Sequence, residues 1–361
     1  MFRAQHTATA TIHRQALSHN YQRIKSMAPG SKVLAVLKAN AYGHGLVRIA
    51  KSLPQADAFG VARIDEALEL RQGGVVKPIV LLEGFFELDH LPILAANNLQ
   101  TIVHNRQQLE ALEQAQLTES IKVWLKVDTG MHRLGVEPSE FAEFYQRLKQ
   151  CSNVQDNILL MSHLGCADDL QMVNTTEQVA LFEQLTGHLA DEKSLANSAG
   201  ICAWPHSHYQ WVRPGLMLYG IDPLVANHDK TLDLQPVMTL HASLIAKRHI
   251  KAGDSVGYGA TWQAKQDTCI GVVSIGYGDG YPRHAPTGTP VLVNGRKVSI
   301  VGRVSMDMIT VDLGADAKDN IGDYVELWGA SLNVNEVAKW ATTIPYELLC
   351  NISKRVKIEL V

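Results

Sequence analysis

The sequence has no apolar run that approaches the roughly 20 residues needed for a membrane-spanning helix. Its first residues, MFRAQHTATATIHRQAL, contain no apolar stretch of the kind found in secretory signal peptides. We therefore expect a cytoplasmic protein that has no membrane partner.

An excess of charge of either sign is also missing. Lys and Arg together number 33 and Asp and Glu 36, which gives a formal net charge of -3 at pH 7. Nucleic acids and anionic membranes attract proteins with a broad basic surface, so we do not expect a nucleic-acid partner.

Cysteine is scarce, and the five that occur are scattered without any C-x-x-C spacing. This pattern argues against a disulfide framework and against structural zinc. His206 and His208 lie close together, but no carboxylate or third histidine is placed beside them, so we interpret them as part of a solvated loop and expect no metal. The glycine-rich run at 276–280 lacks the G-x-G-x-x-G spacing of a dinucleotide site.

The order of segments favours a barrel followed by a β domain. With 361 residues, 46% of them hydrophobic, the chain can form about two domains or one barrel with an appendage. Up to about residue 220, strand-like runs alternate with helical periodicity, as in residues 138–149 and from Asn174 onward. The runs end in VLAVLK, AFGVA, IVLLEG, LQTIVH, KVWLKVD, ILLMSHLG, LANSAG and LMLYG. Eight such strands fit a (β/α)8 TIM-type barrel, with an open doubly wound sheet as the competing architecture.

After residue 235 the pattern changes to successive short strands, with Asn294-Gly295 suited to a type I′ hairpin. The stretch IDPLVANHDKTLDLQP, residues 221–236, is the best candidate for a linker. We therefore expect a barrel over residues 1–230 and a mostly-β domain over residues 231–361. A first strand near residues 8–16 is expected to pack with the C-terminal domain.

Lys38 ends an apolar strand-like run in VLAVLKANAYGHG. An ammonium group at the end of a buried strand is costly to desolvate, so the side chain should be paired, deprotonated or covalently bound to a partner. A surface lysine that merely follows a strand has the same local sequence, and this stretch alone leaves the choice open.

Other chemical groups also stand just after predicted strands, where the active sites of parallel barrels lie. Arg133 can orient an anion with its planar fork, and His163 follows the strand of MSHLG. Ser198, Arg213 and the amides near Gly215 can form a phosphate cradle. Taken singly, each also fits a structural role: a surface charge, a core histidine or a simple R-P-G turn.

Nine motifs together, in order, resemble the alanine racemase family: AVLKANAYGHG, LKVDTGMHRLG, SHLGCADD, NSAG, WVRPGLMLYG, GYGATW, GYGDGYPR, GRVSMDM and PYELLC. The resemblance runs from about residue 33 to the C-terminal strands. It implies a (β/α)8 barrel, a C-terminal β domain, the cofactor pyridoxal 5′-phosphate and a homodimer whose active sites lie at the subunit interface.

The resemblance also assigns roles to residues. Lys38 matches the cofactor-linked lysine and one of two bases, and Tyr258 matches the opposite base, contributed by the other subunit. His163 matches the residue that links the cofactor ring to that tyrosine, and Arg213 the partner of the pyridine nitrogen. The positions that match the phosphate-binding set are Tyr42, Ser198, Gly215, Leu216 and Tyr346.

For the substrate, Arg133 matches a residue near the carboxylate, Met306 a carboxylate-binding backbone position and Tyr277 an entrance residue. Lys126 matches a lysine that steadies this arginine and is carbamylated in some members, and Asp307 is a further supporting residue.

The implied reaction is the interconversion of L-alanine and D-alanine, for peptidoglycan synthesis or alanine catabolism. Inverting an α-carbon in a rigid site needs two opposed bases, because one base returns the proton to the face it came from. The sequence departs from the family pattern at Met308, Gly278 and Gln210, where glutamine, alanine and an acid are common, which affects fine substrate preference.

Two other functions share parts of the pattern. A fold-related decarboxylase would use the same lysine but must hold a longer side chain, whereas Tyr277 and Tyr346 are expected to narrow the entrance. A small non-catalytic protein that binds the same cofactor would have a barrel and a lysine, but no β domain to supply a second base.

Overall fold

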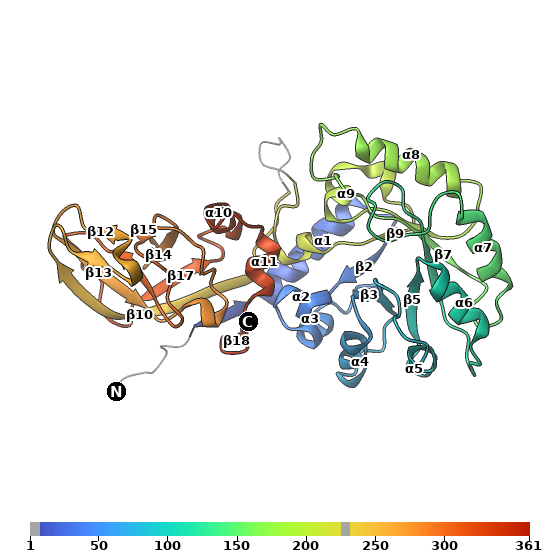
Figure 1. Cartoon of the computed structure of the whole chain (residues 1–361), viewed down its shortest axis with the longest axis horizontal. Coiled ribbons are helices and arrows are strands. Elements are labelled where there is room, and N and C mark those ends of the chain that lie inside the picture. Colours follow the sequence, from blue (N-terminus) through green and yellow to red (C-terminus); the bar gives the residue numbers. More distant parts are fainter. Residues whose placement is uncertain (1–7, 225–231) are drawn as a thin grey trace.

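Eight parallel strands close into a barrel in the N-terminal half of this computed structural model, which describes residues 8–224 and 232–361 (Figure 1). Most of these strands are buried along their whole length, as expected for a parallel sheet covered on both faces. The barrel strands, in order, are β2 (Lys32–Val36), β3 (Ala58–Val61), β4 (Ile79–Leu81), β5 (Leu99–Val103), β6 (Val123–Lys126), β7 (Leu159–Met161), β8 (Lys193–Ser194) and β9 (Trp211–Val212). The predicted barrel is confirmed, and the open doubly wound sheet is wrong because β9 pairs with β2.

Helices surround the barrel on its outer side (Figure 1). The two helical segments picked out from the sequence are α7 and α8, and α7 buries Phe141, Phe144 and Leu148 on one face. The helices of this half are α1 (Arg14–Met27), α2 (Lys38–Tyr42), α3 (Leu46–Ser52), α4 (Ile64–Gln72), α5 (His90–Ala96), α6 (Arg106–Gln114), α7 (Phe141–Gln150), α8 (Asn174–Thr186) and α9 (Ser198–Ala203).

The eighth predicted strand is wrong in its position. The segment LMLYG forms a 3-10 helix, η2 (Leu216–Tyr219), and the strand that closes the barrel is the shorter β9 before it. All four residues of η2 are buried, and a short apolar run of this kind has no periodicity that distinguishes a strand from a buried helical turn. Gly220 ends the turn in a left-handed conformation, with φ +83°.

The C-terminal half is built on an eight-stranded sheet in the order β13-β16-β15-β14-β17-β10-β1-β18, and β13 also pairs with β10. Its long strand β10 therefore contacts β1, β13 and β17. The strands are β1 (Thr9–Ile12), β10 (Met238–Ile250), β13 (Thr268–Val273), β14 (Pro290–Val293), β15 (Arg296–Ile300), β16 (Ile309–Asp312), β17 (Tyr324–Trp328) and β18 (Lys357–Leu360). The mostly-β character of this half is as predicted.

The hairpin between β14 and β15 turns at Asn294 and Gly295, which have φ of +48° and +81°. Positive φ at both positions is what a type I′ turn requires, so the predicted hairpin is confirmed. A smaller ribbon of β11 (Ser255–Val256) and β12 (Trp262–Gln263) carries η3 (Tyr258–Ala260) at its tip.

The two ends of the chain meet in the C-terminal sheet. β1 pairs antiparallel with β10 and parallel with β18, although it precedes the whole barrel in the sequence. The expected linker over residues 221–236 includes residues 225–231, and the expected boundary between residues 230 and 231 lies in that stretch, outside the described residues.

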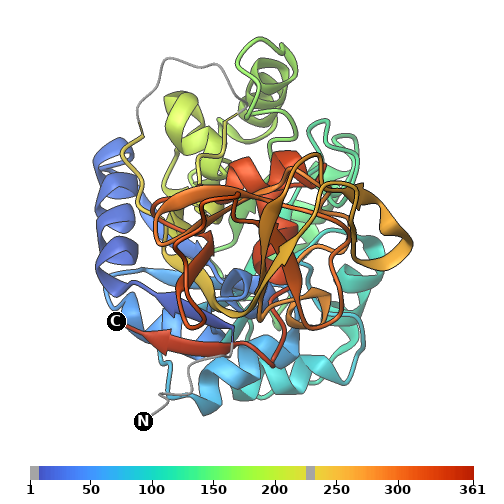
Figure 2. The same cartoon turned by 90° about the vertical axis from the view of Figure 1, so that its left-hand side faces the viewer.

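The β domain lies in front of the ring of barrel helices when the molecule is turned by 90° (Figure 2). Two short helices of this half, α10 (Val334–Trp340) and α11 (Pro345–Cys350), lie near the barrel, and α11 packs on α2. Within the described residues, no helix combines the length and the apolar character needed to cross a bilayer.

Candidate active site

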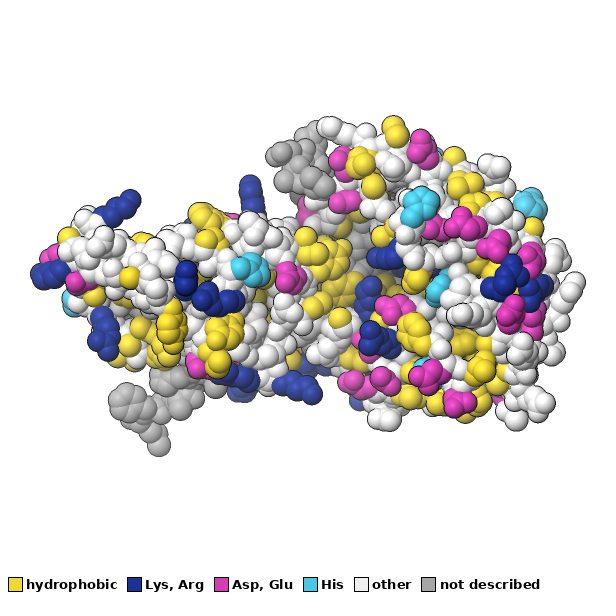
Figure 3. Space-filling view, viewed as in Figure 1, with side chains coloured by type: hydrophobic (Ala, Val, Ile, Leu, Met, Phe, Trp, Pro, Cys, Tyr) yellow, Lys and Arg dark blue, Asp and Glu magenta, His cyan; other side chains and the backbone are white. Residues whose placement is uncertain are grey.

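A cavity of about 610 Å³ opens beside the carboxyl ends of the barrel strands. In the space-filling view, basic side chains gather in the hollow between the two halves of the molecule (Figure 3). Ten of the residues proposed from the sequence line this cavity: Lys38, Tyr42, Lys126, Arg133, His163, Ser198, Arg213, Gly215, Leu216 and Tyr346. The structure therefore brings together side chains from most strands of the barrel.

Lys38 follows β2 after a single residue, Leu37, and begins a left-handed turn. Ala39, Asn40 and Ala41 have φ of 54°, 55° and 52°, with ψ of 53°, 44° and 51°, and Tyr42 also has a positive φ. A left-handed helical conformation costs an L-residue about 1–2 kcal/mol, so four successive non-glycine residues store several times that amount. Such a turn persists only where its surroundings hold it.

Arg213 is the buried centre of the basic cluster. Its Nη1 donates to Ser194 Oγ at 2.6 Å, and its Nη2 donates to Ser162 O at 2.6 Å. Burial lowers the pKa of this guanidinium to about 10, so it remains charged at neutral pH. Its Nη2 also lies 3.3 Å from His163 Nδ1, which must accept because a guanidinium has only donors.

The neighbours of this fixed charge are driven toward their neutral forms. Burial, followed by the charges of Arg213 and Lys126, holds the pKa of His163 well below its usual value. Burial, followed by the charges of Arg213 and Arg133, lowers the pKa of Lys126 to about 7. His163 is therefore a neutral imidazole with its hydrogen on Nε2, and the Lys126 amine is partly unprotonated at neutral pH.

Hydroxyl groups and backbone amides also line the cavity. Ser198 Oγ accepts from Gly215 N at 2.9 Å and from Met217 N at 3.3 Å. A Cβ atom at position 215 would lie 2.6 Å from the Tyr42 hydroxyl, so only glycine lets that phenol approach the backbone here. Tyr346 lies beside Tyr42, with ring centroids 5.8 Å apart. These groups can bind a phosphate through neutral donors.

Four of the residues proposed from the sequence do not line the cavity. Tyr258 stands at the tip of the β11–β12 ribbon with 71% of its surface exposed, and Tyr277 and Met306 are 40% and 53% exposed. The segments that carry the last two are joined, because Gly278 N donates to Met306 O at 2.8 Å. Asp307 pairs with Arg355 at 2.7 Å.

Sequence reasoning missed several residues that line the same cavity. Asn197 precedes Ser198, and its side chain accepts from Gly200 N at the start of α9. Asp168 belongs to the SHLGCADD motif and raises the pKa of Tyr346, although burial is the larger cause. Both residues could have been found from the sequence, because each lies within a motif that follows a strand end. The other missed residues include Glu83, Met131, Pro223 and Ile344.

Comparison with known proteins gives one consistent result. Residues 12–223 match the family model of the alanine racemase N-terminal domain, and residues 237–360 match that of the C-terminal domain. An alanine racemase from Vibrio cholerae is 58% identical over 351 residues, which cover 97% of this chain and 97% of that protein.

Solved structures agree with the sequence relatives. The biosynthetic alanine racemase from Pseudomonas aeruginosa superposes with a TM-score of 0.95 at 44% identity, covering 98% of this chain and 99% of that one. An alanine racemase from Bartonella henselae, solved with covalently bound pyridoxal phosphate, has a TM-score of 0.89 at 32% identity and covers 98% of this chain and 99% of that one.

The lowered pKa of Lys126 predicts a pH-dependent stability. A lysine in an unfolded chain titrates near 10.5, so between pH 7 and 10.5 the unfolded state binds more protons than the folded state does. The free energy of unfolding should therefore rise with pH in this window, by up to about 1.4 kcal/mol per pH unit from this group. Lys126→Met should remove that rise.

Urea unfolding of the cofactor-free protein at pH 7, 8 and 9, in CO2-free buffer, measures this difference between wild type and variant. Lys51→Met is the matched control, because Lys51 is exposed on α3. A difference between wild type and Lys126→Met that stays constant over these pH values would contradict the prediction.

Proposed function

The chain belongs to the alanine racemase family, as its motifs predicted, and on that basis we propose a pyridoxal phosphate-dependent interconversion of L-alanine and D-alanine by two opposed bases. One base is Lys38, and the other is Tyr258 of the partner subunit. The observation that carries this proposal is that Lys38 lines a cavity rich in cations and hydroxyls, whereas Tyr258 stands exposed on the other domain of the same chain.

The residues of the cavity fit pyridoxal phosphate. Lys38 can bind its aldehyde carbon, and the cradle of Tyr42, Ser198, Gly215, Leu216 and Tyr346 can hold its phosphate. The missing Cβ of Gly215 leaves the space in which the Tyr42 hydroxyl and a phosphate oxygen would meet. When bound, this cofactor makes the α-proton of an attached amino acid acidic by delocalising negative charge.

Arg213 sets the electrostatics of the site. Because its pKa remains about 10, it donates hydrogen bonds without giving up a proton, and we assign it to the ring nitrogen of the cofactor. His163 accepts from Arg213 through Nδ1, which leaves its Nε2 hydrogen free to face the partner subunit's Tyr258. A hydrogen bond from this Nε2 to the phenol would connect Arg213 to Tyr258 of the partner subunit through His163.

Proton movement at the α-carbon then involves two faces. The Lys38 amine takes or returns the proton on one face, and Tyr258 of the partner subunit does so on the other. Arg133 orients the substrate carboxylate with its planar fork, steadied by Lys126. Met306 contributes its backbone, Tyr277 narrows the entrance, and Asp307 supports this segment through Arg355.

A homodimer with shared sites is part of the proposal. It is supported by the exposure of Tyr258, Tyr277 and Met306, which gather on the β domain away from the cavity of their own chain. We further propose a division between residues 230 and 231 into a barrel and a β domain, supported by two family-model matches that end and begin on either side of it. The strand β1 is the exception, because it precedes the barrel in the sequence but pairs within the sheet of the β domain.

We place the enzyme in the cytoplasm, where its product serves peptidoglycan synthesis or alanine catabolism. The likeness to the biosynthetic enzyme from Pseudomonas aeruginosa supports the first of these roles.

The direct test is to incubate the purified protein and pyridoxal phosphate with L-alanine, then with D-alanine, and follow optical rotation. Both enantiomers should approach the same racemic end point. Borohydride reduction followed by peptide mapping should place the cofactor on Lys38. Release of carbon dioxide from basic amino acids would instead favour a decarboxylase, and cofactor binding without turnover would favour the non-catalytic alternative.

Tyr258→Phe should affect the two directions unequally. Removing the phenol oxygen eliminates the base on one face only, so α-proton exchange into deuterated solvent should fall by about 100-fold or more for one enantiomer and far less for the other. Tyr324→Phe is the matched control, because Tyr324 is an exposed tyrosine of the same domain. Equal losses for both enantiomers would count against the two-base assignment.

Shared sites predict complementation between inactive chains. Lys38→Ala and Tyr258→Phe homodimers each lack one base at both sites, whereas a mixed dimer has one site with both. Random reassortment of equal amounts should restore about a quarter of wild-type activity, because half of the dimers are mixed and half of their sites are intact. Activity no higher than the mean of the two parents would exclude a base supplied by the partner.

A further inference from the structure

The left-handed turn after Lys38 needs support from outside its own backbone. L-residues disfavour this conformation because Cβ crowds the following carbonyl oxygen, and the two nearby glycines, Gly43 and Gly45, come only after the four strained positions. Backbone hydrogen bonds within the turn connect Gly43 N to Ala39 O at 3.1 Å and Gly45 N to Asn40 O at 3.0 Å. The side chain of Asn40 also accepts from Leu46 N at 2.9 Å, and two further side chains, those of Glu66 and His44, bind the backbone of the turn.

Glu66 binds the start of the turn. It lies on α4, and its Oε1 accepts from Ala39 N at 2.6 Å. The other carboxylate oxygen accepts from Ala62 N at 2.8 Å and Arg63 N at 3.3 Å. One carboxylate therefore fixes the residue after Lys38 to the end of the neighbouring strand β3.

His44 binds the backbone at the end of the turn from the protein interior. The side chain is fully buried, and its Nδ1 lies 3.0 Å from Ala41 O and 2.8 Å from Tyr42 O. Both neighbours are carbonyl oxygens, which only accept, so Nδ1 must carry the hydrogen. Burial lowers the pKa of this imidazole to about 4, so the ring is neutral. Its Nε2 has no hydrogen-bond partner among the described residues.

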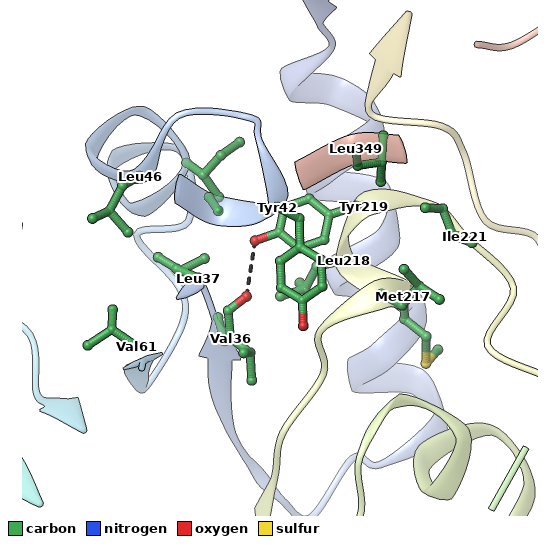
Figure 4. Close-up of a cluster of buried hydrophobic side chains, with 14 of the residues drawn as sticks. Val36, Leu37, Tyr42, Leu46, Val61, Met217, Leu218, Tyr219, Ile221 and Leu349 are labelled. Atoms are coloured by element: carbon green, nitrogen blue, oxygen red, sulfur yellow. Dashed lines mark hydrogen bonds between the residues drawn. The ribbon is translucent and has the colours of Figure 1, made fainter. Parts of the chain in front are cut away.

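Aromatic packing keeps this histidine in place. The centroid of the Tyr219 ring lies 4.5 Å from that of the His44 ring and 4.7 Å from that of the Tyr42 ring. Its hydroxyl donates to Val36 O at 3.0 Å, which is the dashed contact in Figure 4. His44 does not line the cavity, so its polar contacts serve the turn and no bound molecule.

We propose that Glu66 and His44 are positioning residues that hold the left-handed turn, and with it Lys38 and Tyr42, in the arrangement that receives pyridoxal phosphate. Lys38 begins the turn and Tyr42 ends it, and both line the cavity. The proposal rests on the proposed function for the identity of the ligand, but the bracing of the turn is a property of the cofactor-free chain.

The first experiment measures the turn itself. Hydrogen–deuterium exchange of the cofactor-free protein is followed in a peptide that covers residues 37–46. His44→Leu and Glu66→Leu remove a hydrogen-bond partner, and exchange should become about tenfold faster in each. His44→Asn keeps a donor near the Nδ1 position and should stay within about threefold of wild type. Glu66→Gln keeps only one of the two acceptor oxygens, so its exchange rate should lie between those of wild type and Glu66→Leu.

The second experiment measures what the turn positions. The dissociation constant for pyridoxal phosphate should rise about tenfold in the two leucine variants, recover in His44→Asn and recover in part in Glu66→Gln. Adding Ala39→Gly to Glu66→Leu should restore most of the affinity, because glycine adopts this conformation without strain and the Ala39 side chain is exposed.

The results separate the two proposals. Unchanged exchange in both leucine variants, or equal losses in leucine and conservative variants, would overturn the bracing role. If His44→Leu does not fold, the Glu66 pair and Ala39→Gly decide the question alone. A wild-type chain that binds the cofactor but does not racemise alanine would refute the proposed function and leave the exchange result standing.

Discussion

A buried guanidinium organises the candidate site. Arg213 is 4% exposed and follows β9, and its donors reach Ser194 on β8 and Ser162 just after β7. A buried charge is tolerated only when its N–H donors have hydrogen-bond acceptors. Arg213 finds these acceptors on the neighbouring strands, so its hydrogen bonds fix the ends of β7, β8 and β9 relative to one another. Burial lowers the pKa of both His163 and Lys126, and the fixed charge of Arg213 lowers them further.

The barrel and the β domain are joined at the segment that carries Lys38. α11 packs on α2. A Cβ atom on residue 43 would lie only 2.1 Å from the backbone oxygen of Leu349 in α11, so any side chain there would clash. Gly43 therefore serves two needs, a positive φ and the close approach of a helix from the other half. The same short helix carries Tyr346 into the cavity. The geometry around Lys38 thus depends on both halves of the chain.

Much of this arrangement could be predicted from the sequence, because its determinants are local. Strand ends followed by Lys38, His163 and Arg213 indicated a parallel barrel with its chemistry at one face, and Asn294-Gly295 indicated a hairpin. LMLYG was misassigned because a short buried run has no diagnostic periodicity. The left-handed conformation of the turn at Ala39 could not be predicted from the sequence, because alanine rarely adopts a positive φ. The contacts of Glu66 and His44 could not be predicted either, because they depend on tertiary packing.

The pairing of β1 with β10 and β18 has a consequence for biosynthesis. During synthesis β1 finds its partners β10 and β18 only after about 230 and 350 further residues have been made. Until then the nascent β1 is an unpaired edge. A fragment that begins after the barrel would lack β1, which lies between β10 and β18, and would leave unpaired strand edges to which strands of other molecules can bind.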